Sequence, residues 1–89
     1  MNTKKSIIFI INPISGTQEK DVIPKLIEEH LDKTLFHHKE VFTEYAGHAA
    51  ELAHHYANEG IDIVVAVGGD GTVNEVARSL VHTHTALGI

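Results

Sequence analysis

The segment Gly68–Gly71 holds three glycines and one aspartate, and Thr72 follows it directly. Glycines let a backbone turn sharply and approach a ligand without a Cβ in the way. A helix that begins here would direct its free N–H groups and the positive end of its dipole at the same place. The pattern therefore predicts a site for a phosphate chain, with the hydroxyl of Thr72 as a further donor.

Asp70 is unexpected beside phosphate, because two negative charges repel each other unless a metal ion or a proton lies between them. Two roles remove the conflict. The carboxylate can hold Mg²⁺ directly or through water, or it can accept the proton of an attacking hydroxyl. Asp70 is therefore the candidate catalytic residue, although the sequence offers no complete set of metal ligands around it.

A purely structural interpretation of the same segment also stays open. Thr72 and Glu75 form the T-x-x-E pattern of a capping box, in which Thr72 would cap the helix and occupy donors that a phosphate needs. The segment is not the dinucleotide fingerprint, because Asn74 stands where the last glycine belongs. It is not a Walker A loop either, because no Gly-Lys-Ser/Thr follows.

A second candidate loop follows the first apolar run of the chain. Asn12 ends that run, so its side chain is expected at the rim of the predicted sheet. Ser15 and Gly16 can offer a hydroxyl and unobstructed N–H groups to a phosphate, but a plain turn explains these residues equally well. Thr43 ends the next apolar segment on the same rim, either to bond a nucleotide or to form a turn. The whole loop consists of Asn12, Pro13, Ile14, Ser15 and Gly16.

Apolar runs alternate with amphipathic stretches along the chain. The runs are typical of strands buried in a parallel sheet, and stripes at helical spacing indicate helices between them. Pro24 is expected in the first turn of the first helix, where proline is tolerated, and Gly60 is placed to end the second. The predicted strands are 6–12, 39–43, 61–67 and 86–89, and the predicted helices are about 21–32, 46–58 and 72–80.

This β-α-β-α-β-α-β order predicts an α/β fold of three layers, Rossmann-like, with a mostly parallel sheet and right-handed crossovers. The two most apolar strands, 6–12 and 61–67, should be central and adjacent, with 39–43 outside the first. Open α/β sheets bind ligands beyond the carboxyl ends of their strands, where the strand order reverses. The loops Asn12–Gly16 and Gly68–Asn74 are therefore expected to meet at one crevice.

Composition limits the classes of function. The chain has 89 residues, which suits one small domain, and its net charge of -5 provides no basic field for nucleic acid or anionic lipid. It has no cysteine, which excludes disulfides and thiolate metal sites. Its apolar runs are too short for a signal sequence or for the ~20 residues of a membrane span. We expect a cytoplasmic domain without a nucleic-acid partner.

Together the two loops resemble the diacylglycerol kinase catalytic domain family. Gly68–Val76 (GGDGTVNEV) is similar to the family's GGDGTxNEV motif, Asn12–Gly16 (NPISG) to its NPxSG loop, and Thr43 with His48-Ala49 to a weaker third element. NAD kinases and phosphofructokinases carry boxes like GGDGT, so the Asn-Glu-Val continuation and the NPxSG loop distinguish the lipid kinases. The resemblance covers almost the whole chain and implies the N-terminal lobe of the NAD kinase/diacylglycerol kinase-like fold.

The resemblance implies ATP as phosphoryl donor, Mg²⁺ as cofactor and a lipid hydroxyl, of diacylglycerol or sphingoid type, as acceptor. Asp70 would act near the transferred phosphoryl group, as a metal contact or as a base. The positions that would line the nucleotide site are Asn12, Pro13, Ile14, Ser15, Gly16, Thr43, Gly68, Gly69, Asp70, Gly71, Thr72, Val73 and Asn74.

Members of the family continue into a β-rich second domain. We therefore expect residues 1–89 to be the N-terminal part of the catalytic domain, and to be inactive alone. Peripheral contact with the inner membrane surface is expected from the remaining part of the enzyme. The lipid acceptor and the oligomeric state, monomer or homo-oligomer, stay open.

Two other functions stay open as well. An NAD-kinase-like phosphotransferase would use the same ATP loops with a soluble acceptor, and a non-catalytic nucleotide-sensing module would bind nucleotide without transferring phosphate. A receiver domain would need an acidic pair where Asn12 stands. A dehydrogenase would need the glycine fingerprint after the first strand, although Glu44 stands where a ribose-binding acid could.

Overall fold

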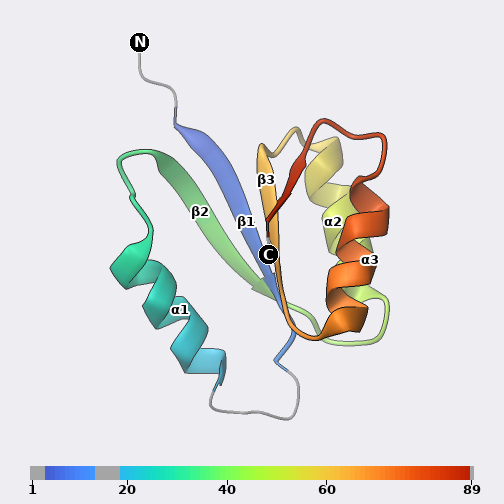
Figure 1. Cartoon of the computed structure of the whole chain (residues 1–89), viewed down its shortest axis with the longest axis horizontal. Helices are drawn as coiled ribbons and strands as arrows, with labels where there is room; N and C mark the ends of the chain where they lie inside the picture. Colours follow the sequence, from blue (N-terminus) through green and yellow to red (C-terminus); the bar gives the residue numbers. More distant parts are fainter. Residues whose placement is uncertain (1–3, 14–18, 89) are drawn as a thin grey trace.

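The computed structural model describes residues 4–13 and 19–88, which form one parallel sheet with helices between its strands (Figure 1). This arrangement confirms the predicted α/β class and the alternation of strands and helices. The elements are β1 (Lys5–Ile11), α1 (Glu19–His30), β2 (Phe36–Phe42), α2 (His48–Asn58), β3 (Ile63–Val67), α3 (Asp70–Leu80) and β4 (Ala86–Gly88).

The strand order is β2-β1-β3-β4, and each neighbouring pair is parallel. The prediction that the first and third strands are adjacent, with the second outside the first, is thus confirmed. Because all the strands run the same way, the carboxyl ends of β1, β2 and β3 lie at one end of the sheet, the lower end in Figure 1. Any site built from the loops after these strands must lie at that end.

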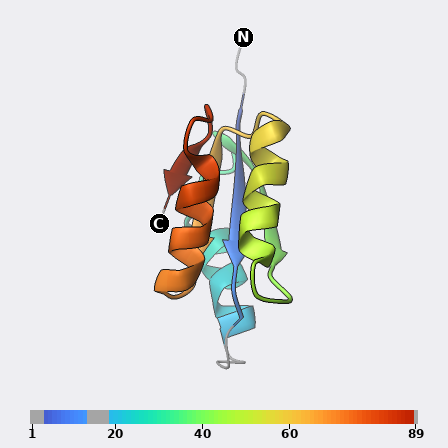
Figure 2. The same cartoon turned by 90° about the vertical axis from the view of Figure 1, so that its right-hand side faces the viewer.

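The helices cover both faces of the sheet and give a Rossmann-like arrangement of three layers. In Figure 2, α2 and α3 lie in front of the sheet and α1 lies behind it. Side chains alternate along a strand, so Ile8 and Ile10 of β1 belong to the core on the α2/α3 side. Ile7 and Ile11 are buried too, at positions that alternate with these. Burial of both faces explains why β1 is a continuous apolar run.

Some predicted boundaries were wrong by a few residues. β2 begins at Phe36 instead of residue 39, because its pairing with β1 continues through His37 and His38, whose polar side chains do not follow an apolar pattern. α2 begins at His48 instead of residue 46, and β3 begins at Ile63 instead of residue 61. The C-terminal stop of α2 was predicted correctly, because Gly60 takes the left-handed conformation (φ 82°) there.

The first helix begins earlier than the sequence pattern indicated. α1 starts at Glu19 instead of residue 21, so Pro24 is an interior residue of the helix. The prediction that this proline lies in the first turn was therefore wrong. The predicted start of this helix followed from its stripe of apolar residues. The helical backbone begins before that stripe, at Glu19.

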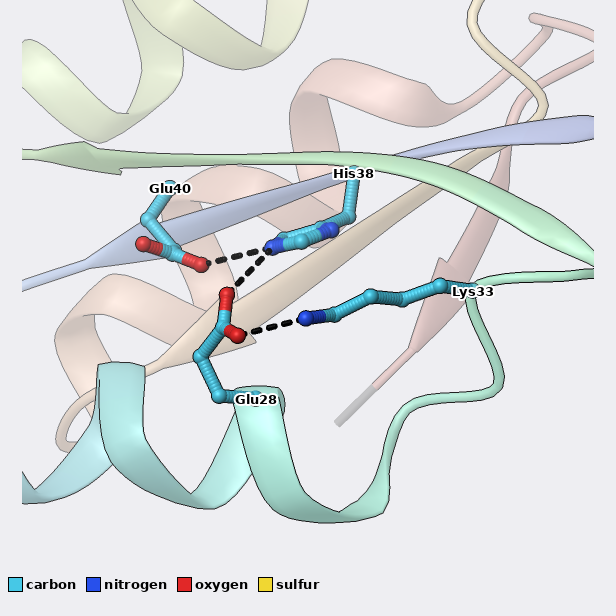
Figure 3. Close-up of polar contacts among 4 residues, drawn as sticks. All are labelled: Glu28, Lys33, His38 and Glu40. Carbon is cyan, nitrogen blue, oxygen red and sulfur yellow. Dashed lines mark hydrogen bonds and ion pairs between the residues drawn. The ribbon is translucent and has the colours of Figure 1, made fainter.

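Polar contacts tie α1 to β2 (Figure 3). Nε2 of His38 lies 3.0 Å from a carboxylate oxygen of Glu40 and 4.0 Å from one of Glu28. The Lys33 ammonium donates a hydrogen bond to Glu28, and this bond and the positive charge hold the pKa of the Glu28 carboxyl below its usual value. The half-buried His38 thus joins the exposed face of α1 to the edge strand.

Asp62 fastens the start of β3 to β1. One of its carboxylate oxygens accepts hydrogen bonds from the backbone N–H of Ser6 at 2.8 Å and from the Ser6 hydroxyl at 3.2 Å. The Ser6 hydroxyl oxygen in turn accepts the backbone N–H of Asp62 at 3.0 Å. Donation from the Ser6 backbone, together with the hydroxyl bond, lowers the pKa of the Asp62 carboxyl below its ordinary value of 3.8.

Because the pKa of Asp62 is lowered in the folded state, the free energy of unfolding should depend on pH. A carboxyl with a depressed folded-state pKa stabilises the fold above its ordinary pKa, and this contribution is lost as the pH falls through the folded-state pKa. Between about pH 5 and pH 2, the free energy of unfolding should fall further for the wild type than for Asp62→Asn, whose amide oxygen can still accept from Ser6. Denaturant unfolding at each pH measures this, and equal losses would contradict the assignment.

The centre of the sheet should dominate stability. Ile10 is fully buried (0% exposed), so Ile10→Ala removes apolar contacts and leaves a cavity that should lower the free energy of unfolding by about 2–5 kcal/mol. Leu35, which is 57% exposed, provides the control, because Leu35→Ala should change it by less than about 0.5 kcal/mol. Chemical denaturation compares the two variants, and similar losses would show that the core is assigned wrongly.

Candidate functional site

A pocket of about 350 Å³ opens where the first three strands lead into their loops and helices. Its walls come from segments that are far apart in the sequence and meet at the carboxyl end of the sheet, between α2 and α3. The lining residues are Asn12, Pro13, Thr43, Glu44, Tyr45, Ala46, Gly47, Ala49, Thr72 and Glu75.

Asn12 and Thr72 connect two of these segments directly. The side-chain amide of Asn12 donates a hydrogen bond to the Thr72 hydroxyl oxygen at 3.0 Å, across 60 residues of sequence. Backbone bonds hold the neighbouring strand ends, because Asn12 N–H donates to the Val67 carbonyl and Thr43 N–H donates to the Ile11 carbonyl, each at 2.9 Å. The structure thus gathers Asn12, Pro13, Thr43 and Thr72, whereas the predicted site residues Ile14, Ser15 and Gly16 lie outside the described residues.

The helix after the glycine segment starts earlier than predicted. α3 begins at Asp70, with Gly69 as N-cap and no side-chain hydrogen bond at the cap. The alternative in which Thr72 caps the helix was therefore wrong. Thr72 is already inside the first turn, is 6% exposed, and accepts from Asn12. Backbone N–H groups in the first turn of a helix have no intrahelical partner, so this uncapped start leaves donors for an anion.

The glycines of this segment meet different surroundings. A Cβ at Gly68 would lie 2.9 Å from the Thr72 hydroxyl oxygen and 3.1 Å from the Asn12 Cβ. Only glycine therefore fits between these two residues. Among the residues that the structure describes, none has an atom within 4 Å of a Cβ built at Gly69 or Gly71. Gly68 is therefore needed by the fold, whereas no described residue fills the space over Gly69 and Gly71.

Not every predicted residue lies at the pocket. The pocket lining does not include Gly68, Gly69, Asp70, Gly71, Val73 or Asn74. The Val73 side chain packs against the core, so only its backbone remains for a ligand. Asp70 and Asn74 are exposed on α3. The glycine segment thus sits at the start of α3, next to the pocket wall that Thr72 and Glu75 form.

The loop after β2 contributes residues that the sequence analysis did not include. Tyr45 stacks on His48, with ring centroids 4.3 Å apart and ring planes 12° apart. Its hydroxyl donates to a Glu51 carboxylate oxygen at 2.7 Å, a bond that raises the pKa of Tyr45 above its usual value. The backbone N–H of Glu44 donates to Nδ1 of His48 at 2.9 Å. An aromatic residue between Thr43 and His48-Ala49 was the signal in the sequence for this wall.

The pocket itself has acidic character. Among the described residues that line it, Glu44 and Glu75 carry carboxylates and none is a lysine or an arginine. Among residues 4–13 and 19–88, no group of three or more histidine, aspartate or glutamate residues is placed to hold a metal ion. No helix of the described part is long and apolar enough to cross a membrane.

The fold and this site define a Rossmann-like α/β domain with a pocket at the carboxyl end of a parallel sheet. Residues 6–89 match the family described as the diacylglycerol kinase catalytic domain. The chain belongs to this family of kinases, which confirms the resemblance drawn from the two loops.

Individual relatives agree with the family. Protein YtlR of Bacillus subtilis strain 168, provisionally named as a lipid kinase, is 35% identical over 81% of this chain and 24% of its own length. A protein of Streptococcus pneumoniae serotype 4, also provisionally named as a lipid kinase, is 43% identical over 85% of this chain and 26% of its own. A diacylglycerol kinase of Staphylococcus aureus strain RF122 is 33% identical over 86% of this chain and 24% of its own length. The chain thus spans about a quarter of the length of these curated relatives.

The close packing around Gly68 predicts that a larger residue at this position lowers the free energy of unfolding. In Gly68→Ala the new methyl group would press on Thr72 and Asn12, and such overpacking should lower the free energy of unfolding by about 1–3 kcal/mol. Gly71→Ala is the matched control, because its methyl group points into open space. Thermal or denaturant unfolding measures both. Equal stabilities would mean that the two loops do not pack as the structure places them.

Proposed function

We propose that this chain supplies the nucleotide-binding lobe of an ATP-dependent lipid kinase. The enzyme would transfer the γ-phosphoryl group of ATP to a hydroxyl of a diacylglycerol or sphingoid lipid. One observation carries the proposal: in a chain of the diacylglycerol kinase family, Gly68–Gly71 leads into an uncapped helix start beside a pocket.

The phosphates of ATP fit the start of α3. No side chain in the described part of the chain caps this end of the helix, and none of these residues fills the space over Gly69 and Gly71. Backbone N–H groups and the positive end of the helix dipole both favour an anion there. The backbone can reach the phosphate oxygens closely because no Cβ intervenes at either glycine.

Asp70 is the residue that we propose to act on the transferred group. It is exposed in the first turn of α3, where its carboxylate can reach solvent and a bound phosphate. Mg²⁺ keeps several water ligands and is usually held by one or two carboxylates together with phosphate oxygens. A single exposed carboxylate fits that mode, and the ion would neutralise charge on the phosphates.

The acceptor is proposed from the family and its relatives. A lipid hydroxyl lies at a membrane surface, so the enzyme would work as a peripheral protein at the inner face of the membrane. Transfer from ATP to this hydroxyl needs the two oxygens in line with the phosphorus atom, and positioning and charge stabilisation supply most of the catalysis. A soluble acceptor such as NAD is the competing possibility that the assay must separate.

The product of the complete gene should be assayed with γ-labelled ATP, Mg²⁺ and a panel of diacylglycerol, sphingosine, ceramide and NAD. We expect label in one lipid, and a loss of about 10²–10⁴-fold in rate for Asp70→Asn. Asp62→Asn is the matched control, because this aspartate lies at the opposite end of the sheet, and its rate should stay near that of the wild type.

Other outcomes of this assay would redirect the assignment. Label in NAD would replace the lipid acceptor by a soluble one. ATP binding without label in any acceptor would contradict the kinase and favour the nucleotide-sensing module. Unchanged transfer by Asp70→Asn would remove this carboxylate from the reaction.

Gly69→Ala separates binding from folding. Gly69 has φ -80° and ψ -174°, which any residue adopts, and its new methyl group would contact none of the described residues. The free energy of unfolding should therefore change by less than about 1 kcal/mol. ATP affinity, measured by calorimetry, should fall about 10-fold or more, since the methyl group occupies the space proposed for phosphate. Undiminished affinity would place the phosphates elsewhere.

A further inference from the structure

We propose that the ring of Tyr45 is the surface on which the adenine ring of the nucleotide stacks, so that the pocket holds the nucleoside and α3 holds the phosphates. This inference rests on the proposed function and deepens it, because it divides the site into two parts with different chemistry. It is carried by the orientation of Tyr45, the charge of the pocket and the small residues beside the ring.

Tyr45 is an exposed aromatic ring that is nevertheless fixed in place. It is 54% exposed, yet one face stacks on His48 and its hydroxyl is bonded to Glu51. His48 is itself held, because its Nδ1 accepts the backbone N–H of Glu44. Much of the freedom that a tyrosine loses on binding is thus already lost in this protein. Tyr45 is also one of the residues that line the pocket, so a preordered aromatic residue stands at the pocket wall.

The charge of the pocket decides which part of the nucleotide enters it. Glu44 and Glu75 line the pocket, and the described lining residues include no lysine or arginine, so these carboxylates would repel a triphosphate. The same carboxylates can accept hydrogen bonds from ribose hydroxyls or from the amino group of adenine. The triphosphate is better placed at the uncapped start of α3.

The shape of the pocket suits a flat ring. Its volume of about 350 Å³ lies within the range of ~300–1,000 Å³ for small-molecule sites. Next to Tyr45 the wall is made of Ala46, Gly47 and Ala49, whose side chains are small. Asn12 and Thr72 stand on the side of the pocket that leads to α3, so a nucleoside on Tyr45 directs its phosphates toward Gly69 and Gly71.

Three ligands test this division on the product of the complete gene: ATP, adenosine and inorganic tripolyphosphate. Loss of base stacking in Tyr45→Ala should weaken ATP and adenosine by roughly 5- to 100-fold and leave tripolyphosphate unchanged. Leu35→Ala is the matched control. Leu35 is similarly exposed (57%) but lies at the other end of the sheet, where its carbonyl accepts Lys5 N–H, and the variant should bind all three ligands like the wild type.

Two further variants keep the test valid if Tyr45→Ala folds poorly. Tyr45→Phe loses only the bond to Glu51 and should keep most of the ATP affinity, because the ring remains. Tyr45→Trp places a fluorophore at the proposed contact, and residues 1–89 hold no other tryptophan, so its emission is obtained as the difference between this variant and the wild type. Its emission should be quenched by ATP and adenosine, and not by tripolyphosphate.

The outcomes separate the inference from the function on which it rests. If ATP binds to Tyr45→Ala as tightly as to the wild type, the adenine position is wrong while the kinase assignment stands. An equal loss of tripolyphosphate binding would show that Tyr45 only supports the structure, and would overturn the inference. Absence of both ATP binding and label transfer in the wild type would overturn the proposed function together with this inference.

Discussion

The parallel pairing of β1 with β3 is the constraint on which the rest of the structure depends. It aligns Ile8 with Val64 and Ile10 with Ala66, and these residues form the buried centre of the sheet. The same register carries Asn12 to the end of β3, where its backbone N–H meets the Val67 carbonyl. A slip of one residue would move each β1 side chain to the other face of the sheet and disrupt its packing, and it would also part the two loops. Core and site are therefore set by one register.

Thr72 contributes both to the packing of the fold and to the wall of the pocket. Its hydroxyl accepts from Asn12, and its side chain leaves no room for a Cβ at Gly68. The loop is consequently rigid at Gly68 and open at Gly69 and Gly71. A phosphate site needs both properties, because fixed N–H donors lose little freedom on binding and an open backbone can reach the oxygens.

Prediction from the sequence succeeded where apolar patterning decides the structure. The order of the strands followed from the two most apolar runs, which can be buried only at the centre of a sheet. Prediction was poorer at β2, where His37 and His38 are paired to β1 through backbone groups that carry no apolar signal. It also placed the start of α3 too late, because Gly68–Gly71 was interpreted as a turn, whereas the helix begins at Asp70 with Gly69 as N-cap.

The sequence by itself determined the family, the alternation of strands and helices, and the residue types at the candidate site. These follow from local patterns, such as glycine spacing and apolar periodicity, that each short segment carries on its own. Only the tertiary structure decided that Tyr45 and Glu44 share a pocket with Asn12 and Thr72. Such neighbours lie up to 60 residues apart, and they meet because backbone pairing between strands fixes where each loop leaves the sheet.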